Sequence, residues 1–234
     1  MPPAPRHVGG NGPGMNLKGA VFDFDGTLFD SMYIWDTAGE TYLRSLGKTP
    51  KPSMQEEIKS MSLQQSACYF KEEYALDLTV EEIIQGINRT IERFYLSEVQ
   101  PKAGVLDFLK ALAEAGICMC IATATDRYQI LAALQRCGMD GLFSAILTCS
   151  EVGHGKDEPT IYRKAMESLG TDRSNTIILE DAYHAALTAK HDGFLTAGVF
   201  DPSENRQEAL REICDCYLSD FAHTEPFWKL ASAL

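Results

Sequence analysis

The sequence predicts an α/β fold: a doubly wound parallel-sheet (Rossmann-like) core with a small α-helical cap domain inserted after the first strand. Two observations lead to this prediction. From residue 101 onward, short apolar runs alternate with helical segments, as expected for repeated strand and helix units. Residues 31–100 instead show one helical pattern after another, with hardly a strand among them. We therefore predict a core of residues 15–30 and 101–234 and a cap of residues 31–100.

The first strand is predicted from the run Gly-Ala-Val-Phe-Asp-Phe at residues 19–24, which is short, apolar and rich in strand formers. The run breaks at Asp25-Gly26, a pair that favours a turn. Asp23 is therefore expected at the carboxyl end of a buried strand. Residues 1–14 are dense in Pro and Gly and contain little that could be buried, so they predict a disordered N-terminal extension.

The remaining elements follow from periodicity and from glycine stops. In the predicted cap, helical spacing indicates four segments, at residues 35–46, 55–61, 63–74 and 80–94. In the predicted core, strands are expected at residues 117–122, 145–148, 176–179 and 194–199. Helices, each ending near a glycine, are expected at residues 105–115, 128–137, 160–169 and 183–191. Past residue 201 the pattern weakens, and closing helices that include Trp228 are expected.

Composition narrows the class of partner. The chain of 234 residues has a formal net charge of −12, which argues against binding to nucleic acids or anionic membranes, because both need clustered Lys and Arg. No apolar run approaches the roughly 18 residues of a membrane helix. The seven cysteines are an odd number and no signal-peptide pattern is present, so we expect reduced thiols and a cytoplasmic location. Small-molecule chemistry is therefore favoured, and the chain is expected to be a monomer or a weak dimer.

The candidate site comes from the polar residues that follow the apolar strands, because ligands of such sheets bind beyond the carboxyl ends of the strands. Four strand ends supply unusual side chains. These are Asp23 and Asp25 after the first strand, Thr123 after the second, Lys156 beyond the third, and Glu180 with Asp181 after the fourth.

These residue types suit phosphoryl transfer. Carboxylates and carbonyls bind a hard cation such as Mg²⁺, while a hydroxyl, a lysine and turn amides bind phosphate. A carboxylate that attacks a phosphate meets repulsion of about 4 kcal/mol per charge pair at a separation of about 4 Å. Mg²⁺ and Lys156 would cancel that charge and leave Asp23 free to act as the nucleophile. Asp25 would protonate the leaving oxygen and later activate water.

The run Asp-Phe-Asp-Gly-Thr-Leu-Phe-Asp-Ser at residues 23–31 resembles the first motif of the haloacid dehalogenase-like superfamily, in the subgroup with a helical cap. The other motifs follow in the family's order. Thr123 in Ile-Ala-Thr-Ala-Thr resembles the second-motif hydroxyl, and Lys156 in Gly-Lys-Asp-Glu-Pro-Thr-Ile-Tyr the third-motif lysine. Glu180-Asp181 resembles the acidic fourth motif. One Asp-x-Asp-Gly-Thr is moderately specific, but four motifs in order are strong.

The resemblance implies a role for each matched position. Asp23 would be the nucleophile and a metal ligand, and Asp25 the acid and base, with its carbonyl on Mg²⁺. Asp181 would bind the metal with Glu180 assisting, although Glu180 could equally be a structural partner. The implied phosphate-binding residues are Gly26, Thr27, Thr123, Ala124 and Lys156.

Within the superfamily, the residues favour a phosphatase. Asp25 carries a carboxylic acid at a position where the family's dehalogenases lack one, so a dehalogenase is a poor match. The motif residues around Phe24 also differ from those of phosphonoacetaldehyde hydrolases. A β-phosphoglucomutase-like enzyme is the alternative, but it needs cations for a second phosphate. Trp35, Leu63 and Asp126 stand where that family has His, Arg and Lys. We therefore predict a Mg²⁺-dependent phosphomonoester hydrolase that acts on a small phosphorylated metabolite through an aspartyl-phosphate intermediate. The alternative of another class is a non-catalytic phospholigand-binding protein.

Two further groups of residues are open to more than one interpretation. Asp30 and Ser31 are expected to cap the first cap helix rather than touch substrate. Met32, Tyr33, Trp35 and the 61–66 turn could line a substrate pocket, but Met and aromatic residues at helical spacing favour core packing.

Overall fold

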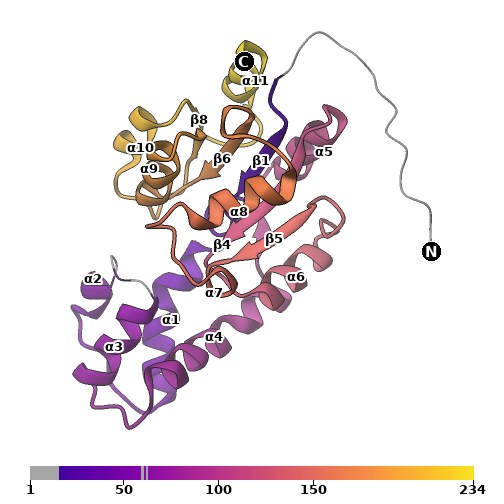
Figure 1. Ribbon diagram of the computed structural model, residues 1–234. Coiled ribbons are helices and arrows are strands. Elements are labelled where there is room, and N and C mark those ends of the chain that lie inside the picture. Colours follow the sequence, from indigo (N-terminus) through magenta and orange to yellow (C-terminus); the bar gives the residue numbers. More distant parts are fainter. Residues whose placement is uncertain (1–15, 59–60, 62) are drawn as a thin grey trace.

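The structure, a computed structural model, describes residues 16–58, 61 and 63–234. Figure 1 shows a larger body built around a sheet and a smaller helical body that contains α1 to α4. The predicted disorder of residues 1–14 lies outside the described residues. Within the described part of the chain, no helix combines the length and the apolar composition needed to cross a bilayer.

The core sheet has six strands in the order β5-β4-β1-β6-β7-β8, and every neighbouring pair is parallel. This confirms the predicted fold class. The strand order changes direction around β1, which has β4 on one side and β6 on the other. The strands are β1 (Gly19–Phe22), β4 (Cys118–Thr123), β5 (Ala145–Thr148), β6 (Thr176–Glu180), β7 (Leu195–Val199) and β8 (Cys216–Leu218).

Strand β8 was not predicted, because closing helices were expected over this part of the chain. It has only three residues, two of them half-buried, which is too short for an alternating pattern to be visible. The expected closing helix around Trp228 is present as α11 (Glu225–Ala233). A second helix, α10 (Gln207–Ile213), lies between β7 and β8.

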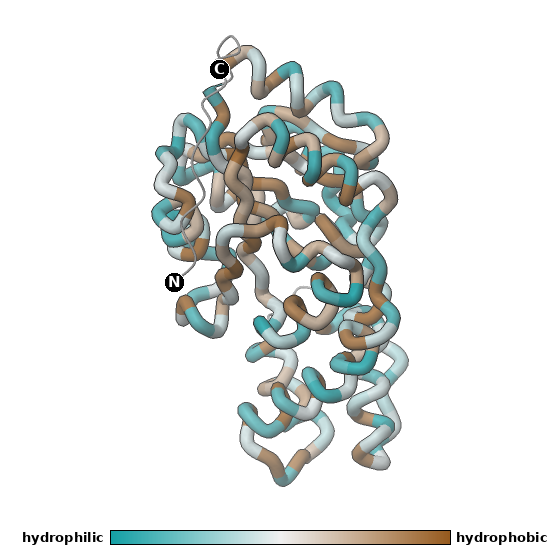
Figure 2. The backbone as a smooth tube through the Cα atoms, turned by 90° about the vertical axis from the view of Figure 1, so that its right-hand side faces the viewer, coloured by the Kyte–Doolittle hydropathy of each residue, from teal (hydrophilic) through white to brown (hydrophobic). Residues whose placement is uncertain are grey.

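Helices cover both faces of the sheet, so the central strands are buried on both sides. Ala20 and Phe22 of β1 belong to an apolar cluster with α5, α6 and α11, whereas Val21 belongs to a second cluster with α8 and α9. In Figure 2 the hydrophobic stretches run through the interior of the larger body. The helices not yet defined are α5 (Val105–Glu114), α6 (Arg127–Arg136), the short α7 (Cys149–Val152), α8 (Thr160–Leu169), η1 (Arg173–Asn175) and α9 (Tyr183–His191).

The smaller body begins and ends at two short paired strands, β2 (Phe29–Asp30) and β3 (Gln100–Pro101), which run antiparallel. The predicted domain boundaries, 30/31 and 100/101, fall at these strands. The described residues between them form four helices: α1 (Met32–Ser45), α2 (Met54–Ile58), α3 (Leu63–Glu73) and α4 (Val80–Ser97). Helix α4 begins with a capping box between Thr79 and Glu82.

Helix α4 also reaches the core. The Asn88 amide donates to the Asp126 carboxylate at 3.1 Å, and the Gln129 amide donates to the Asn88 carbonyl at 3.3 Å. The guanidinium of Arg136 donates to the carbonyl of Val99. These bonds hold α4 of the cap against α6 of the core.

Close packing of α1 and α4 gives a prediction about the stability of the cap. A Cβ atom on Gly86 would lie 2.2 Å from the ring of Tyr42, which is buried. We expect Gly86→Ala to lower the free energy of unfolding by about 1 kcal/mol, because overpacking outweighs the gain in helix propensity. Denaturant unfolding measures the change. Gly141→Ala, where an added Cβ meets nothing within 4 Å, is the control, and a stabilised Gly86→Ala variant would contradict this packing.

Candidate active site

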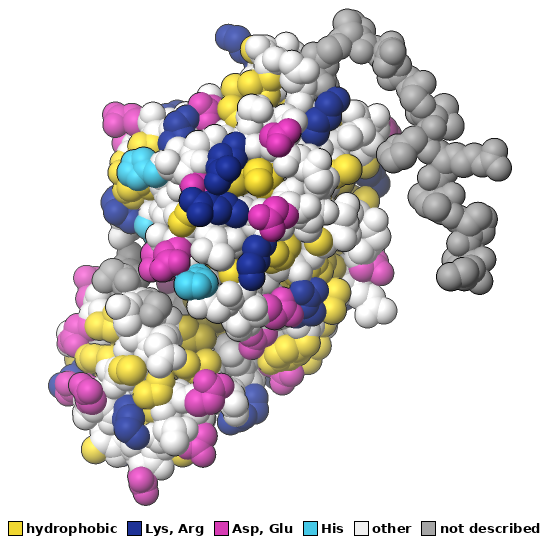
Figure 3. All heavy atoms as spheres, viewed as in Figure 1, with side chains coloured by type: hydrophobic (Ala, Val, Ile, Leu, Met, Phe, Trp, Pro, Cys, Tyr) yellow, Lys and Arg dark blue, Asp and Glu magenta, His cyan; other side chains and the backbone are white. Residues whose placement is uncertain are grey.

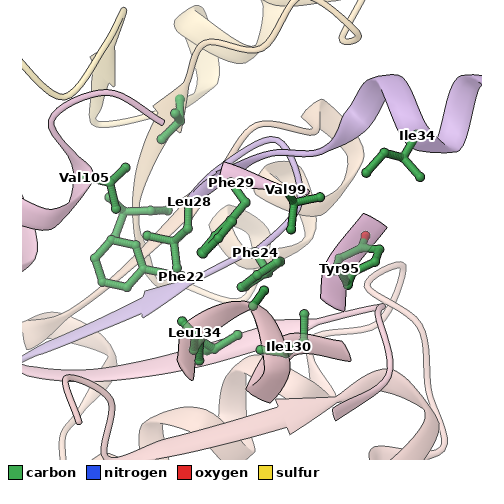
Figure 4. Close-up of a cluster of buried hydrophobic side chains, with 14 of the residues drawn as sticks. Phe22, Phe24, Leu28, Phe29, Ile34, Tyr95, Val99, Val105, Ile130 and Leu134 are labelled. Carbon is green, nitrogen blue, oxygen red and sulfur yellow. The ribbon is translucent and has the colours of Figure 1, made fainter. Parts of the chain in front are cut away.

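The loop after β1 is fixed by backbone bonds and by a pair of aromatic rings. The Asp23 N–H donates to the Leu179 carbonyl at 3.0 Å, and the Gly26 N–H donates to the Phe29 carbonyl at 2.9 Å. The rings of Phe24 and Phe29 stack with centroids 4.2 Å apart, within the apolar cluster drawn in Figure 4. Because alternate residues point to opposite sides, Phe22 and Phe24 enter the core while Asp23 and Asp25 line a cavity.

Three carboxylates meet at the adjacent ends of β1 and β6. Asp23, Glu180 and Asp181 each place an oxygen so that the three atoms lie within 4.8 Å of one another. Their residues are only 7%, 1% and 4% exposed. Lys156, from the loop between α7 and α8, donates to the Asp23 carboxylate and, at 2.8 Å, to Glu180 Oε1. The structure thus brings together four of the predicted residues.

The charges of this cluster do not balance. Burial raises the pKa of Asp23 to about 6, although Lys156 opposes the shift. Burial, together with the Asp23 and Glu180 charges, holds the pKa of Asp181 well above its usual range. Burial alone would lower the pKa of Lys156, but the Asp23 and Glu180 carboxylates raise it, so Lys156 stays charged. One lysine therefore faces three buried carboxylates, an arrangement that a divalent cation would stabilise.

Asp181 is placed for such a cation by two neighbours. The Thr27 hydroxyl donates to Asp181 Oδ1 at 3.1 Å. A Cβ atom on Gly26, whose φ is +79°, would lie 2.3 Å from Asp181 Oδ2, so only glycine leaves room for this carboxylate. The donor set of buried carboxylate oxygens matches the preference of Mg²⁺ for hard oxygen ligands.

One carboxylate oxygen of Glu180 already accepts two hydrogen bonds from protein groups. Its Oε1 accepts from Lys156 and, at 2.7 Å, from the hydroxyl of Tyr162, which is fully buried. These two bonds favour the interpretation of Glu180 as the partner that orients Lys156. Its role as a metal ligand remains a prediction.

Asp25 is surrounded by hydroxyl groups. Ser31 donates to Asp25 Oδ1 and Thr125 to Oδ2, both at 2.6 Å, and Tyr95 of α4 donates to Oδ1 as well. The Trp35 indole N–H in turn donates to the Tyr95 hydroxyl at 3.0 Å. Burial and the Asp23 charge raise the pKa of Asp25, while the three hydroxyls oppose this by stabilising the carboxylate.

The capping role expected for Ser31 is therefore wrong. Ser31 is the N-cap residue of α1, but its side chain makes no capping bond, because the hydroxyl is directed to Asp25 instead. Asp30 ends β2 and is exposed. Ser31 thus connects the start of the first cap helix to the predicted acid.

Only some of the predicted phosphate-binding residues line the cavity. Ala124 and Lys156 line the cavity, together with Thr125, whereas Gly26, Thr27 and Thr123 do not. The Thr123 hydroxyl accepts from the Thr125 N–H at 3.1 Å and so shapes the turn after β4. Phosphate contacts by these residues remain predictions.

The cavity that contains the acidic cluster has a volume of about 680 Å³ and extends from the core into the cap. Met32, Trp35, Met61, Leu63 and Ser66 line it, although helical spacing favoured core packing for the Met and aromatic residues. Trp35 and Leu63 also pack against the apolar core, so each of these side chains contributes both to the core and to the cavity lining. Tyr33 is 50% exposed and lies outside the cavity.

Sequence reasoning missed several contacts of the site. Thr125 and Tyr162 are the last residues of the motifs Ile-Ala-Thr-Ala-Thr and Gly-Lys-Asp-Glu-Pro-Thr-Ile-Tyr, but the family resemblance implied no role for them. Position in those motifs was the signal that could have found them. Tyr95 lies on a cap helix 70 residues from Asp25, and no spacing pattern indicates that contact.

Comparison with known proteins agrees with this geometry. The family model described as haloacid dehalogenase-like hydrolase matches residues 20–199. Pyrophosphatase PpaX of Anoxybacillus flavithermus is 27% identical over 187 residues, covering 79% of this chain and 84% of that protein. Phosphoglycolate phosphatase of Neisseria meningitidis is 27% identical over 205 residues, covering 79% and 80%.

A solved structure shows the same fold. The crystal structure of CbbY from Rhodobacter sphaeroides in complex with phosphate matches with a TM-score of 0.79 at 20% identity, covering 93% of this chain and all of that one. A parallel α/β core with an inserted helical cap and a buried acidic cluster at its strand ends is the class that fold and site define. The chain belongs to the haloacid dehalogenase-like hydrolase family.

The acidic cluster predicts that Mg²⁺ stabilises the folded protein. At a concentration about 100 times its Kd, a ligand of the native state adds about 2.7 kcal/mol to the free energy of unfolding, or several degrees in Tm. We expect this rise in the wild-type chain and its loss in Asp181→Asn, which removes one carboxylate. Thermal unfolding with and without Mg²⁺ measures it. Asp140→Asn, an exposed residue after α6, should behave as wild type, and an unchanged rise in Asp181→Asn would refute the assignment.

Proposed function

We propose that the chain is a Mg²⁺-dependent phosphatase that hydrolyses a small phosphorylated metabolite through an aspartyl-phosphate on Asp23. The observation that supports this most directly is the convergence of Asp23, Lys156 and Asp181 in one buried cluster. The named relatives support it as well, since they are a pyrophosphatase and a phosphoglycolate phosphatase.

In the first half of the reaction, a carboxylate oxygen of Asp23 attacks the phosphorus atom. The bond between phosphorus and the ester oxygen breaks, and Asp25 in its acid form gives its proton to that oxygen. The raised pKa of Asp25 fits this duty, because the protonated form is then more accessible. Lys156, held by Asp23 and Glu180, would bind the phosphoryl oxygens and neutralise their charge.

In the second half, the Asp25 carboxylate takes a proton from water as the water oxygen attacks phosphorus. The bond from phosphorus to Asp23 breaks, and inorganic phosphate and the free Asp23 carboxylate result. The hydroxyls of Ser31, Thr125 and Tyr95 hold Asp25 in one orientation for both proton transfers.

The side chains of Asp23 and Asp181 would hold the metal, with the carbonyl of Asp25 and, as predicted from the motif, Glu180. When bound, Mg²⁺ would supply positive charge that offsets the repulsion between carboxylate and phosphate. The fit rests on the excess of buried carboxylates and on the room that Gly26 leaves beside Asp181.

Hydrolysis is favoured over phosphoryl transfer between sugars. A mutase would need cationic groups in the cap for a second phosphate. Trp35 and Leu63 line the cavity without such a charge, and Asp126 is bonded to Asn88 of the cap. A cytoplasmic location and a monomeric or weakly dimeric state remain predictions from composition.

The nucleophile assignment is tested with p-nitrophenyl phosphate. We expect Asp23→Asn to lower kcat by roughly 10³-fold or more, and Asp25→Asn by roughly 10²- to 10⁴-fold. Chelation of Mg²⁺ by EDTA should abolish turnover, and borohydride reduction of the quenched wild-type enzyme should convert Asp23 to homoserine.

Asp77→Asn, an exposed residue between α3 and α4, serves as the control and should turn over substrate normally. Full activity of Asp23→Asn, or in EDTA, would end the proposal. A hexose 1-phosphate separates the alternatives, since a phosphatase releases inorganic phosphate and a mutase yields the 6-phosphate. A protein that only binds phospholigands would do neither.

A further inference from the structure

The cavity beside the acidic cluster is much larger than a phosphoryl group requires. Its volume of about 680 Å³ lies in the range of sites that enclose whole small-molecule ligands. The phosphoryl end is defined by Asp23 and Lys156, so the remaining space belongs to the leaving group. The chemistry of its walls therefore indicates which leaving groups fit.

Most of the cap side of the cavity is apolar. Six large side chains line it, five from α1, α2 and α3 and the sixth Met61: Met32, Trp35, Ile58, Met61, Leu63 and Phe70. Such walls bind an apolar ring or chain by the hydrophobic effect, and the aromatic and thioether groups also tolerate a cation. The neutral polar groups of the cap wall, Gln55 and Ser66, add hydrogen-bonding capacity.

The charged side chains of the cap wall are acidic. Asp36 of α1 and Glu56 of α2 both line the cavity and are exposed, and neither forms an ion pair with another described residue. In the view of Figure 3, most charged side chains of the smaller helical body are likewise Asp and Glu. An anionic group on the leaving alcohol would meet these carboxylates, whereas a cationic group would be attracted.

No described residue of the lining offers a free cation to compensate. Lys156 is the one Lys or Arg among the described lining residues, and it is bound to Asp23 and Glu180 at the phosphoryl end. His184 also lines the cavity, but burial and the nearby Lys156 lower its pKa, which favours the neutral ring. Among the described lining residues, a second carboxylate or phosphate on the substrate would therefore meet no counter-charge, at a cost in desolvation.

We infer that the substrate is a phosphomonoester of an apolar alcohol with no second anionic group, and that a positive charge on the alcohol improves binding. This inference rests on the proposed phosphatase function and names its substrate class. Pyrophosphate and phosphoglycolate, each with a second anionic group, fall outside that class. Asp36 and Glu56 are the residues that discriminate by charge.

The test uses three esters that differ in one substituent: benzyl phosphate, 4-(aminomethyl)benzyl phosphate and 4-carboxybenzyl phosphate, with pyrophosphate and phosphoglycolate for comparison. We expect kcat/KM for the neutral and the cationic ester to exceed that of the carboxylate by roughly tenfold or more, because two carboxylates and desolvation act together. In the double variant Asp36→Asn/Glu56→Gln, the ratio of the cationic to the neutral ester should fall about fivefold.

Glu72→Gln, an exposed residue of α3 outside the lining, is the matched control and should keep the wild-type ratio. Preference for the carboxylate ester, pyrophosphate or phosphoglycolate would overturn the inference while leaving the phosphatase function intact. An unchanged ratio in the double variant would overturn the role of Asp36 and Glu56. If p-nitrophenyl phosphate is hydrolysed but none of the three benzyl esters is, the inference fails and the phosphatase function stands. If p-nitrophenyl phosphate is not hydrolysed either, the proposed function fails and the inference with it.

Discussion

The site depends on one electrostatic constraint: three carboxylates are buried together with a single lysine. Removing charged groups from water costs several kcal/mol each unless opposite charges compensate. Lys156 pairs with Asp23 and Glu180, but Asp181 forms no ion pair with any described residue. A fold that keeps this imbalance in its interior is preorganised for a positive ligand, and the raised pKa values of Asp23 and Asp181 are the sign of that unmet charge.

The fold around this cluster determines where its side chains lie. Because β1 and β6 are parallel neighbours, their carboxyl ends deliver Asp23, Glu180 and Asp181 to the same edge of the sheet. The stacked rings of Phe24 and Phe29 and the glycine at position 26 then set the loop that carries Asp25. The cap adds Tyr95, which accepts a hydrogen bond from Trp35 and donates one to Asp25, so the predicted acid is contacted by the domain that lines the rest of the cavity. In the proposed function, catalysis and substrate selection would therefore take place in one cavity.

The sequence predicted correctly those elements and site residues that have a local signal, either an apolar run with clear ends or a motif of chemically distinctive residues. β5, α8 and α9 fall at the predicted residues, since apolar runs, a proline and glycine stops define them, and Asp23, Lys156, Glu180 and Asp181 converge as expected. Contacts between distant segments could not be foreseen. The Tyr95 bond to Asp25 joins a cap helix to a core loop, and the Ser31 hydroxyl satisfies Asp25 although a cap was the local expectation. β8 was not predicted because a strand of three residues is too short to show an alternation of apolar and polar residues.

The central claim is that this acidic cluster binds a divalent cation. Anomalous scattering from crystals grown with Mn²⁺ in place of Mg²⁺ tests it most directly, because the ion reports its own position. The account predicts one strong peak in contact with carboxylate oxygens of both Asp23 and Asp181. A fully occupied Mn²⁺ site elsewhere, with these two carboxylates bound only to protein groups and water, would contradict it.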